Sequence, residues 1–119
     1  MRLAAALALA LLLAACAAPE APRQAPPALQ ARGLTPDANG LQPAGTPLRI
    51  DFGRAQEGVV AAVSRLLGAE PARATRTPGC TAADAEIAWP SGLVLAFRAG
   101  TFVGWRDGAG ASAGATCAG

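Results

Sequence analysis

The placement of proline limits where this chain can fold. Seven of its ten prolines lie within residues 17–47, where no apolar periodicity accompanies them. Each proline removes a backbone N–H donor and biases the preceding residue away from helix. We therefore predict a linker over residues 16–47 and one small folded domain over residues 48–119.

The N-terminus has the order of a bacterial export signal. Arg2 precedes an apolar run, residues 3–15, that is shorter than the roughly 20 residues needed to span a bilayer. The run ends in Leu13-Ala14-Ala15-Cys16, which resembles the lipobox of bacterial lipoproteins. That resemblance implies that residues 1–15 are a signal peptide, that the bond between Ala15 and Cys16 is cut, and that Cys16 carries lipid.

The lipobox resemblance also implies a location. Ala17 is small and neutral, whereas an Asp there is the usual signal for retention in the inner membrane. A diacylglyceryl group with an N-acyl chain such as palmitate supplies more than one hydrophobic anchor. We therefore expect a chain anchored in the outer membrane and facing the periplasm. The alternative is an ordinary secretory signal cut at the neighbouring alanines, which would release the chain into the periplasm.

Missing residue types narrow the chemistry. The chain has no His and no Lys, so the commonest general base, the commonest metal ligand and the Schiff-base amine are all lacking. Its four Asp and four Glu are scattered and form no metal or phosphate motif. We expect no catalysis, no metal and no cofactor. Because 10 basic residues face 8 acidic ones, nucleic acid is not an expected partner.

The cysteine count agrees with export. Three cysteines are an odd number, and lipid on Cys16 would leave Cys80 and Cys117 as a pair. We predict a disulfide between these two, as is common in small exported domains. A reactive thiol pair is the alternative, although the C-x-x-C spacing and a neighbouring His or Lys are lacking.

Local patterns predict an α+β domain. Residues 54–67 have the apolar spacing of an amphipathic helix, with Asp51 or Gly53 as the N-cap and Gly68 just after the end. Alternating residues at 48–52 indicate a short strand before it. Three further alternating runs, joined by short turns, predict a three-stranded antiparallel meander on which the helix packs; they are residues 84–89, 93–98 and 101–106.

The register of this meander follows from its loops. With two-residue loops at 91–92 and 99–100, Val94 lies between Trp89 and Trp105, and both faces of the sheet are apolar. One helix can bury one face. The other is then expected to meet the linker, the Cys117 tail, a second copy or a partner.

Trp89, Trp105 and Arg106 are the candidate binding surface. Amphipathic aromatic residues beside an arginine are frequent in interface hot spots and in sugar stacking. The alternative is that both tryptophans belong to the core of a small domain.

Two resemblances concern the helix region. The stretch Phe52-Gly-Arg-Ala-Gln-Glu through Leu66-Leu-Gly-Ala-Glu-Pro71 resembles an element of BamE/SmpA-type outer-membrane lipoproteins and related BLIP-like modules. Those modules pair helices with a three-stranded sheet and bind other proteins. Phe52-Gly53-Arg54 replaces their usual Gly-Met-Ser/Thr.

Over Leu29 to Trp105 the chain resembles small uncharacterised lipoproteins of alphaproteobacteria. The shared residues include the Phe-Gly-Arg-Ala-Gln stretch, the Ala-Val-Ser-Arg stretch and the Gly-Trp in the last strand. Some of those proteins carry an aspartate-semialdehyde dehydrogenase label. This chain has no dinucleotide-binding fingerprint and no catalytic Cys/His pair, so we do not expect that activity.

These observations together predict a lipid-anchored, non-catalytic structural or interaction module of the cell envelope. Its expected partner is an envelope protein or peptidoglycan, bound on the sheet face that the helix leaves uncovered. The alternative is a periplasmic inhibitor of an envelope hydrolase, and an enzyme is the third reading.

Overall fold

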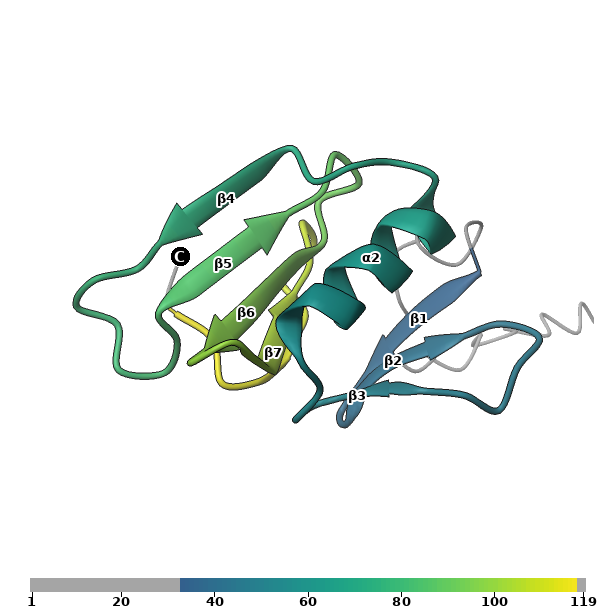
Figure 1. The fold of residues 1–119 in the computed structure, drawn as a ribbon, viewed down its shortest axis with the longest axis horizontal. Coiled ribbons are helices and arrows are strands. Elements are labelled where there is room, and N and C mark those ends of the chain that lie inside the picture. The colour runs from purple at the N-terminus through teal and green to yellow at the C-terminus, as the bar shows by residue number, and fades with distance from the viewer. Residues whose placement is uncertain (1–32, 118–119) are drawn as a thin grey trace, which may run out of the picture.

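A computed structural model describes residues 33–117 (Figure 1). The predicted signal peptide 1–15, Cys16 and the first half of the predicted linker lie outside the described residues. Within the described range, no helix has the length and apolar character needed to cross a bilayer. The elements follow in the order β1 (Leu34–Asp37), β2 (Gly40–Pro43), β3 (Ile50–Asp51), α2 (Gln56–Leu67), β4 (Arg73–Arg76), β5 (Ala85–Ala88), β6 (Val94–Arg98), β7 (Thr101–Arg106) and β8 (Ser112–Gly114).

The strands form two antiparallel sheets. One has the order β1-β2-β3, and the other is a five-stranded meander, β4-β5-β6-β7-β8. The predicted α+β class is confirmed, as are the helix and the disulfide. The predicted three-stranded meander is the centre of the larger sheet, because β4 and β8 extend it on either side. The predicted strand near residues 48–52 is β3, which belongs to the three-stranded sheet and not to the meander.

The predicted linker ends too late. Residues 34–43 form a hairpin, and Leu34 and Leu41 are both 0% exposed in the core. Two prolines fit this hairpin because neither lies within a fully paired central strand. Pro36 is in the edge strand β1, and Pro43 lies beyond the two residues of β2 that pair with β3. The folded unit therefore includes residues 34–43 and does not start at residue 48.

Helix α2 forms where the sequence predicts it. Val59, Val63 and Leu67 recur at helical spacing and are buried. Gly68 adopts a left-handed conformation with φ 64°, and its N–H donates to Arg65 O. Ala69 N–H donates to Ser64 O at 3.1 Å, which completes a Schellman motif.

The predicted N-cap of this helix is wrong. Neither Asp51 nor Gly53 caps α2; the N-cap position is Ala55, and no side chain caps the helix there. Asp51 instead lies in β3 and pairs with Arg49. The first helical N–H, from Gln56, donates to Gly100 O at 2.8 Å, so the β6–β7 turn replaces the side-chain cap.

The predicted register of the meander is also wrong. Trp89 N–H donates to Leu93 O, so the β5–β6 loop has three residues and not two. Ile87 therefore lies opposite Leu95, and Ala88 lies opposite Val94. The β6–β7 turn at residues 99–100 is as predicted, but the register then shifts between Ala96 and Phe97. This bulge restores the apolar residues of β5, β6 and β7 to one face.

One core joins the helix and both sheets. Leu34, Leu41 and Ile50 from the small sheet pack in the same cluster as the buried residues of α2 and the large sheet. The sheet face toward α2 carries Ile87, Leu95, Phe97, Phe102 and Trp105. We call this the inner face. Figure 1 shows α2 lying along it, with β1–β3 on the other side of the helix.

The opposite, outer face is crossed by the C-terminal segment. Ala115 N–H donates to Val103 O, and a side chain added at Gly104 would overlap the Ala115 backbone. Cys117 then reaches the β4–β5 loop, where it forms the disulfide with Cys80. The tail thus covers Ala96 and Gly104, the buried small residues in the middle of this face.

Candidate functional site

The predicted binding surface is not formed, because both tryptophans are in the core. Trp89 is 2% exposed, and its Nε1 donates to Ser64 Oγ on α2. Trp105 is 6% exposed, and its Nε1 donates to Asp37 O in β1 at 2.7 Å. The hydrogen bond from Trp89 links α2 to the inner face of the large sheet, and the one from Trp105 links β1 to it.

Arg106, the third member of that predicted surface, lies on the outer face. Its guanidinium contacts both carboxylate oxygens of Glu86 at 3.2 Å, across the intervening strand β6. The Glu86 side chain is 13% exposed. This pair lies apart from the two tryptophans and forms no common site with them.

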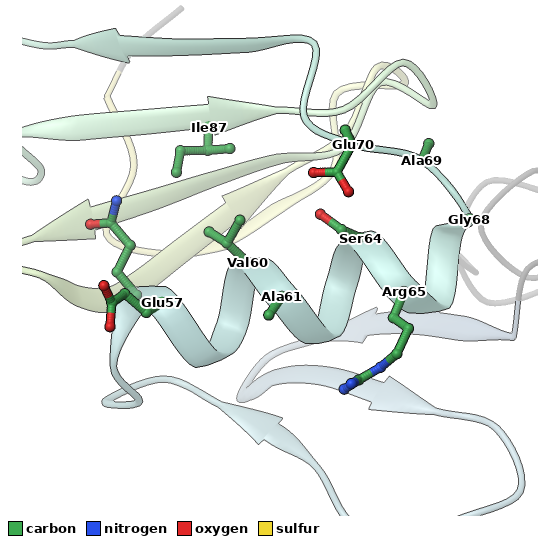
Figure 2. Close-up of a pocket in the computed structure, with 10 residues that line it drawn as sticks. Glu57, Val60, Ala61, Ser64, Arg65, Gly68, Ala69, Glu70 and Ile87 are labelled. Carbon is green, nitrogen blue, oxygen red and sulfur yellow. The ribbon is translucent and has the colours of Figure 1, made fainter.

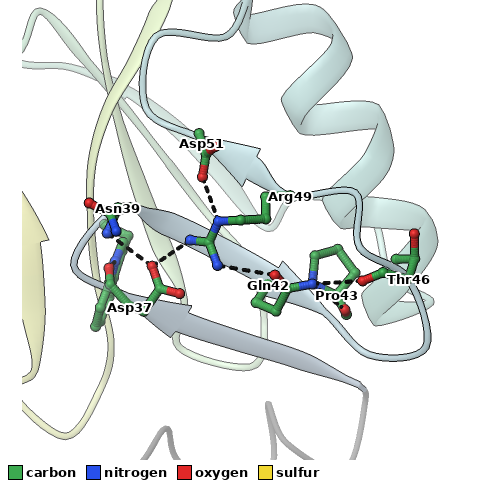
Figure 3. Close-up of polar contacts among 8 residues, drawn as sticks. Asp37, Asn39, Gln42, Pro43, Thr46, Arg49 and Asp51 are labelled. Carbon is green, nitrogen blue, oxygen red and sulfur yellow. Dashed lines mark hydrogen bonds and ion pairs between the residues drawn. The ribbon is translucent and has the colours of Figure 1, made fainter.

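A second charged cluster stabilises the small sheet (Figure 3). Arg49 Nη2 contacts Asp37 Oδ1, Arg49 Nε contacts Asp51 Oδ1, and Arg49 Nη1 donates to Gln42. The hydrogen bond from Arg49 holds the pKa of Asp37 below its usual range, and the two carboxylates raise the pKa of Arg49. Since each charge has its partner within the small sheet or next to it in the chain, we interpret this cluster as structural.

The inner face leaves a groove open beside α2 (Figure 2). Val60 and Ser64 project from the helix toward β5, where Ile87 forms the floor. The groove encloses about 760 Å³ and reaches Glu70, just after the helix. Its centre is aliphatic, and polar side chains line its ends.

The groove continues beneath strand β4. A neighbouring hollow of about 490 Å³ shares Gln56 and Ile87 with it and adds Ala74 and Arg76. Ala74 lies opposite Ile87 in the ladder, so both belong to the inner face. Helix α2 covers β6 and β7 but leaves this end of the sheet open.

Strand β4 is the edge of the large sheet, and all four of its residues are exposed. An edge strand has one row of backbone N–H and C=O groups without a ladder partner. Its two arginines, Arg73 and Arg76, form no salt bridge with another described residue. Groove and edge strand together offer an apolar recess and a strand edge with no described partner. Their charge is mixed, because β4 adds two arginines whereas carboxylates line the groove and the hollow, namely those of Glu57, Glu70, Asp84 and Glu86. We call this combination the α2–β4 groove.

Sequence reasoning did not find the α2–β4 groove. The run Arg73-Ala-Thr-Arg76 is short and polar and lacks the apolar alternation that predicts a strand. The groove itself arises because the helix is too narrow to cover five strands. That count depends on β4 and β8, which the sequence pattern does not signal.

Other chemistry-bearing residues are dispersed. No group of three or more His, Cys, Asp or Glu within residues 33–117 is arranged to hold a metal ion. Asp107 is 7% exposed, and its Oδ1 accepts the backbone N–H groups of Ala109 and Ala111. That carboxylate holds the turn between β7 and β8.

Comparisons with models of protein families, with curated proteins and with solved structures found nothing that matches this chain. The resemblances to outer-membrane lipoproteins therefore stay predictions from the sequence.

Proposed function

We propose that this chain is a lipid-anchored, non-catalytic interaction module of the cell envelope, and that it holds a protein partner in the α2–β4 groove. The observation that carries the proposal is the open inner face at β4 and β5. An apolar recess beside an unpaired strand edge is a combination that protein partners use, because it offers both side-chain burial and backbone hydrogen bonds.

The positions of the aromatic residues favour protein over peptidoglycan. Sugar recognition commonly uses an exposed aromatic ring as a stacking surface. The chain has two Trp and three Phe, and none of the five is exposed. The α2–β4 groove is lined instead by aliphatic and charged side chains such as Val60, Ile87 and Glu70.

Site-specific crosslinking in cells tests this function. A photoreactive amino acid replaces Ala74 in β4 in one strain and Glu57 in α2 in another, so that both probes face the groove. A third strain carries it at Ala109, an exposed residue of the β7–β8 turn, as the matched control. We expect one envelope protein to be captured from both groove positions and not from Ala109.

Two other results would change the interpretation. Equal capture from Ala109, or capture of nothing from the groove, would contradict the proposed function. If the captured protein is an envelope hydrolase whose activity falls in proportion to added chain, the inhibitor reading replaces that of a structural module.

A further inference from the structure

We infer that the partner of the α2–β4 groove is an acidic, extended peptide segment that adds to the edge of β4 as a sixth antiparallel strand. This inference rests on the proposed function and specifies the occupant of the same site. It is argued from the backbone of β4, from the register of the ladder, and from the charges on the strand.

The backbone of β4 is accessible for strand addition. All its residues, Arg73–Arg76, are exposed, and it has β5 on one side and no described strand on the other. Every strand pair of this sheet is antiparallel, so an added strand continues the same pattern. The main-chain hydrogen bonds would supply affinity without requiring a particular sequence.

The register of the ladder assigns each β4 side chain to a face. Ala74 lies opposite the buried Ile87, so Ala74 and Arg76 are on the inner face, beside the groove. Arg73 and Thr75 are therefore on the outer face. A residue added opposite Ala74 would extend its side chain along the inner face, where an apolar group is preferred.

Charge then selects the partner. Residues directly opposite in an antiparallel pair interact, and like charges there are destabilising. A second copy of β4 added to this edge has the same two arginines and no carboxylate to place opposite them. The same two arginines favour a strand with acidic residues opposite them. The edge thus disfavours self-association and selects a strand that reads acidic, any residue, apolar, acidic.

A charge-swap experiment with defined peptides tests the inference. The acidic probe is acetyl-Thr-Glu-Thr-Val-Glu-Thr-amide with a fluorescent label, and the basic probe replaces both Glu with Lys. Their Kd values for the full chain are measured by fluorescence polarisation. We expect the acidic peptide to bind about tenfold or more tightly than the basic one, and the double variant Arg73→Glu, Arg76→Glu to reverse that order.

Two controls separate strand addition from general attraction of charge. The variant Arg54→Glu, Arg98→Glu changes two other exposed arginines and should keep the original preference. Residues 73 and 75 bond to β5, so the free N–H and C=O groups of the edge belong to Ala74 and Arg76. Hydrogen–deuterium exchange should show that the acidic peptide protects the amides of Ala74 and Arg76. Replacing the Val of the peptide, which lies opposite Ala74, by Pro should weaken binding about tenfold, because proline lacks the ladder N–H.

The failure of this inference is distinguishable from failure of the proposed function. Binding without protection of β4, or the same peptide preference in the charge-swapped variant, would refute strand addition while capture from Ala74 and Glu57 still supports a protein-binding groove. Absence of peptide binding together with absence of capture would refute both.

Discussion

Trp105 is one of the residues that join the two sheets. Its ring is 6% exposed on the inner face of the large sheet, and its Nε1 donates to Asp37 O in the small one. We expect Trp105→Phe to lower the free energy of unfolding by about 1–3 kcal/mol, because the carbonyl loses its donor and the smaller ring leaves a space. Guanidinium unfolding of the full chain, followed by circular dichroism, measures this loss.

The matched variant is Trp89→Phe. Trp89 donates to the hydroxyl of Ser64, which is half-buried and can turn toward water. Trp89→Phe is therefore expected to lower the free energy of unfolding by less than Trp105→Phe does. If both variants lose the same free energy, the hydrogen bond between the sheets does not have the importance that we assign to it.

Asp37 predicts a dependence of stability on pH. The hydrogen bond from Arg49 lowers the pKa of Asp37 in the folded chain below its ordinary value. The ionised form is therefore favoured by folding, so this contribution is complete above the unfolded pKa and is lost as the pH falls through the folded pKa. The side chain is 38% exposed, which limits the effect to that of a partly screened pair, about 1 kcal/mol or less.

Unfolding midpoints at pH 7 and pH 3 test this dependence. Asp37→Asn should lose less stability between the two pH values than the unaltered chain does. Glu70→Gln, at an exposed carboxyl that forms no salt bridge with a described residue, should leave the difference unchanged. An acid-induced loss of equal size in Asp37→Asn would contradict the role of this ion pair.

At the scale of the element, substitutions of two glycines, one within α2 and one just after it, are expected to change stability in opposite directions. Gly58 lies within the helix, and an added methyl group there meets no atom within 4 Å. Gly58→Ala should therefore stabilise the chain by about 0.5–1 kcal/mol. Gly68 has φ 64° at the helix end, so Gly68→Ala should destabilise it by about 1–2 kcal/mol. Melting temperatures that shift in the same direction for both variants would contradict this prediction.

The helix could be predicted because its signals are local. The spacing of Val59, Val63 and Leu67 gives the buried stripe, and Gly68 gives the end. Its beginning could not be predicted. The first helical N–H, that of Gln56, donates to the carbonyl of Gly100, which lies 44 positions later in the chain. Capping rules cover side chains near in sequence and do not include a distant backbone carbonyl.

The strands of the meander could be predicted, but their register could not. A shift of one residue moves every side chain to the other face, and two small features each cause such a shift. One is the three-residue loop after Trp89, and the other is the bulge between Ala96 and Phe97 in the β6–β7 pair. The predicted site failed for a separate reason. The sequence pattern does not show which face of the sheet α2 covers, and both tryptophans lie on the covered face.

The hairpin β1–β2 was missed although the sequence contains its signal. Asn39-Gly40 marks a turn in the sequence; in the structure Ala38 and Asn39 form the two-residue loop, and Gly40, with φ 140°, begins β2. Pro36 and Pro43 suggested a linker and obscured it. Proline in an edge strand or past the end of a pairing partner is compatible with a sheet, and position relative to that partner is not visible in the sequence.

At the scale of the whole molecule, the Cys80–Cys117 disulfide closes the fold. It joins residues 37 apart and holds the C-terminal segment over the outer face. The variant Cys80→Ser, Cys117→Ser should lose roughly 4 kcal/mol of stability on the chain-entropy model, with slightly faster exchange of amides in β8. Gly104→Ala, which displaces the same segment by overlap with Ala115, should also expose β8 but keep the disulfide.

Mass spectrometry and hydrogen exchange of these variants decide between two roles of the disulfide. If Gly104→Ala exposes β8 as much as the double serine variant does, the packing of the tail matters more than the covalent bond. Unchanged stability in the double serine variant would show that the covalent bond itself does not stabilise the fold.

The disulfide also bears on the anchor. The chain has three cysteines, and because Cys80 and Cys117 are bonded to each other, Cys16 is the one that the disulfide leaves for lipid. We predict that cells fed an alkyne analogue of palmitate label the full chain and retain it in the membrane fraction. Cys16→Ala should lose the label and enter the soluble envelope fraction, because no acyl chain then holds it to the bilayer. The Cys80→Ser, Cys117→Ser variant should remain labelled, and label that persists on Cys16→Ala would contradict the lipobox assignment.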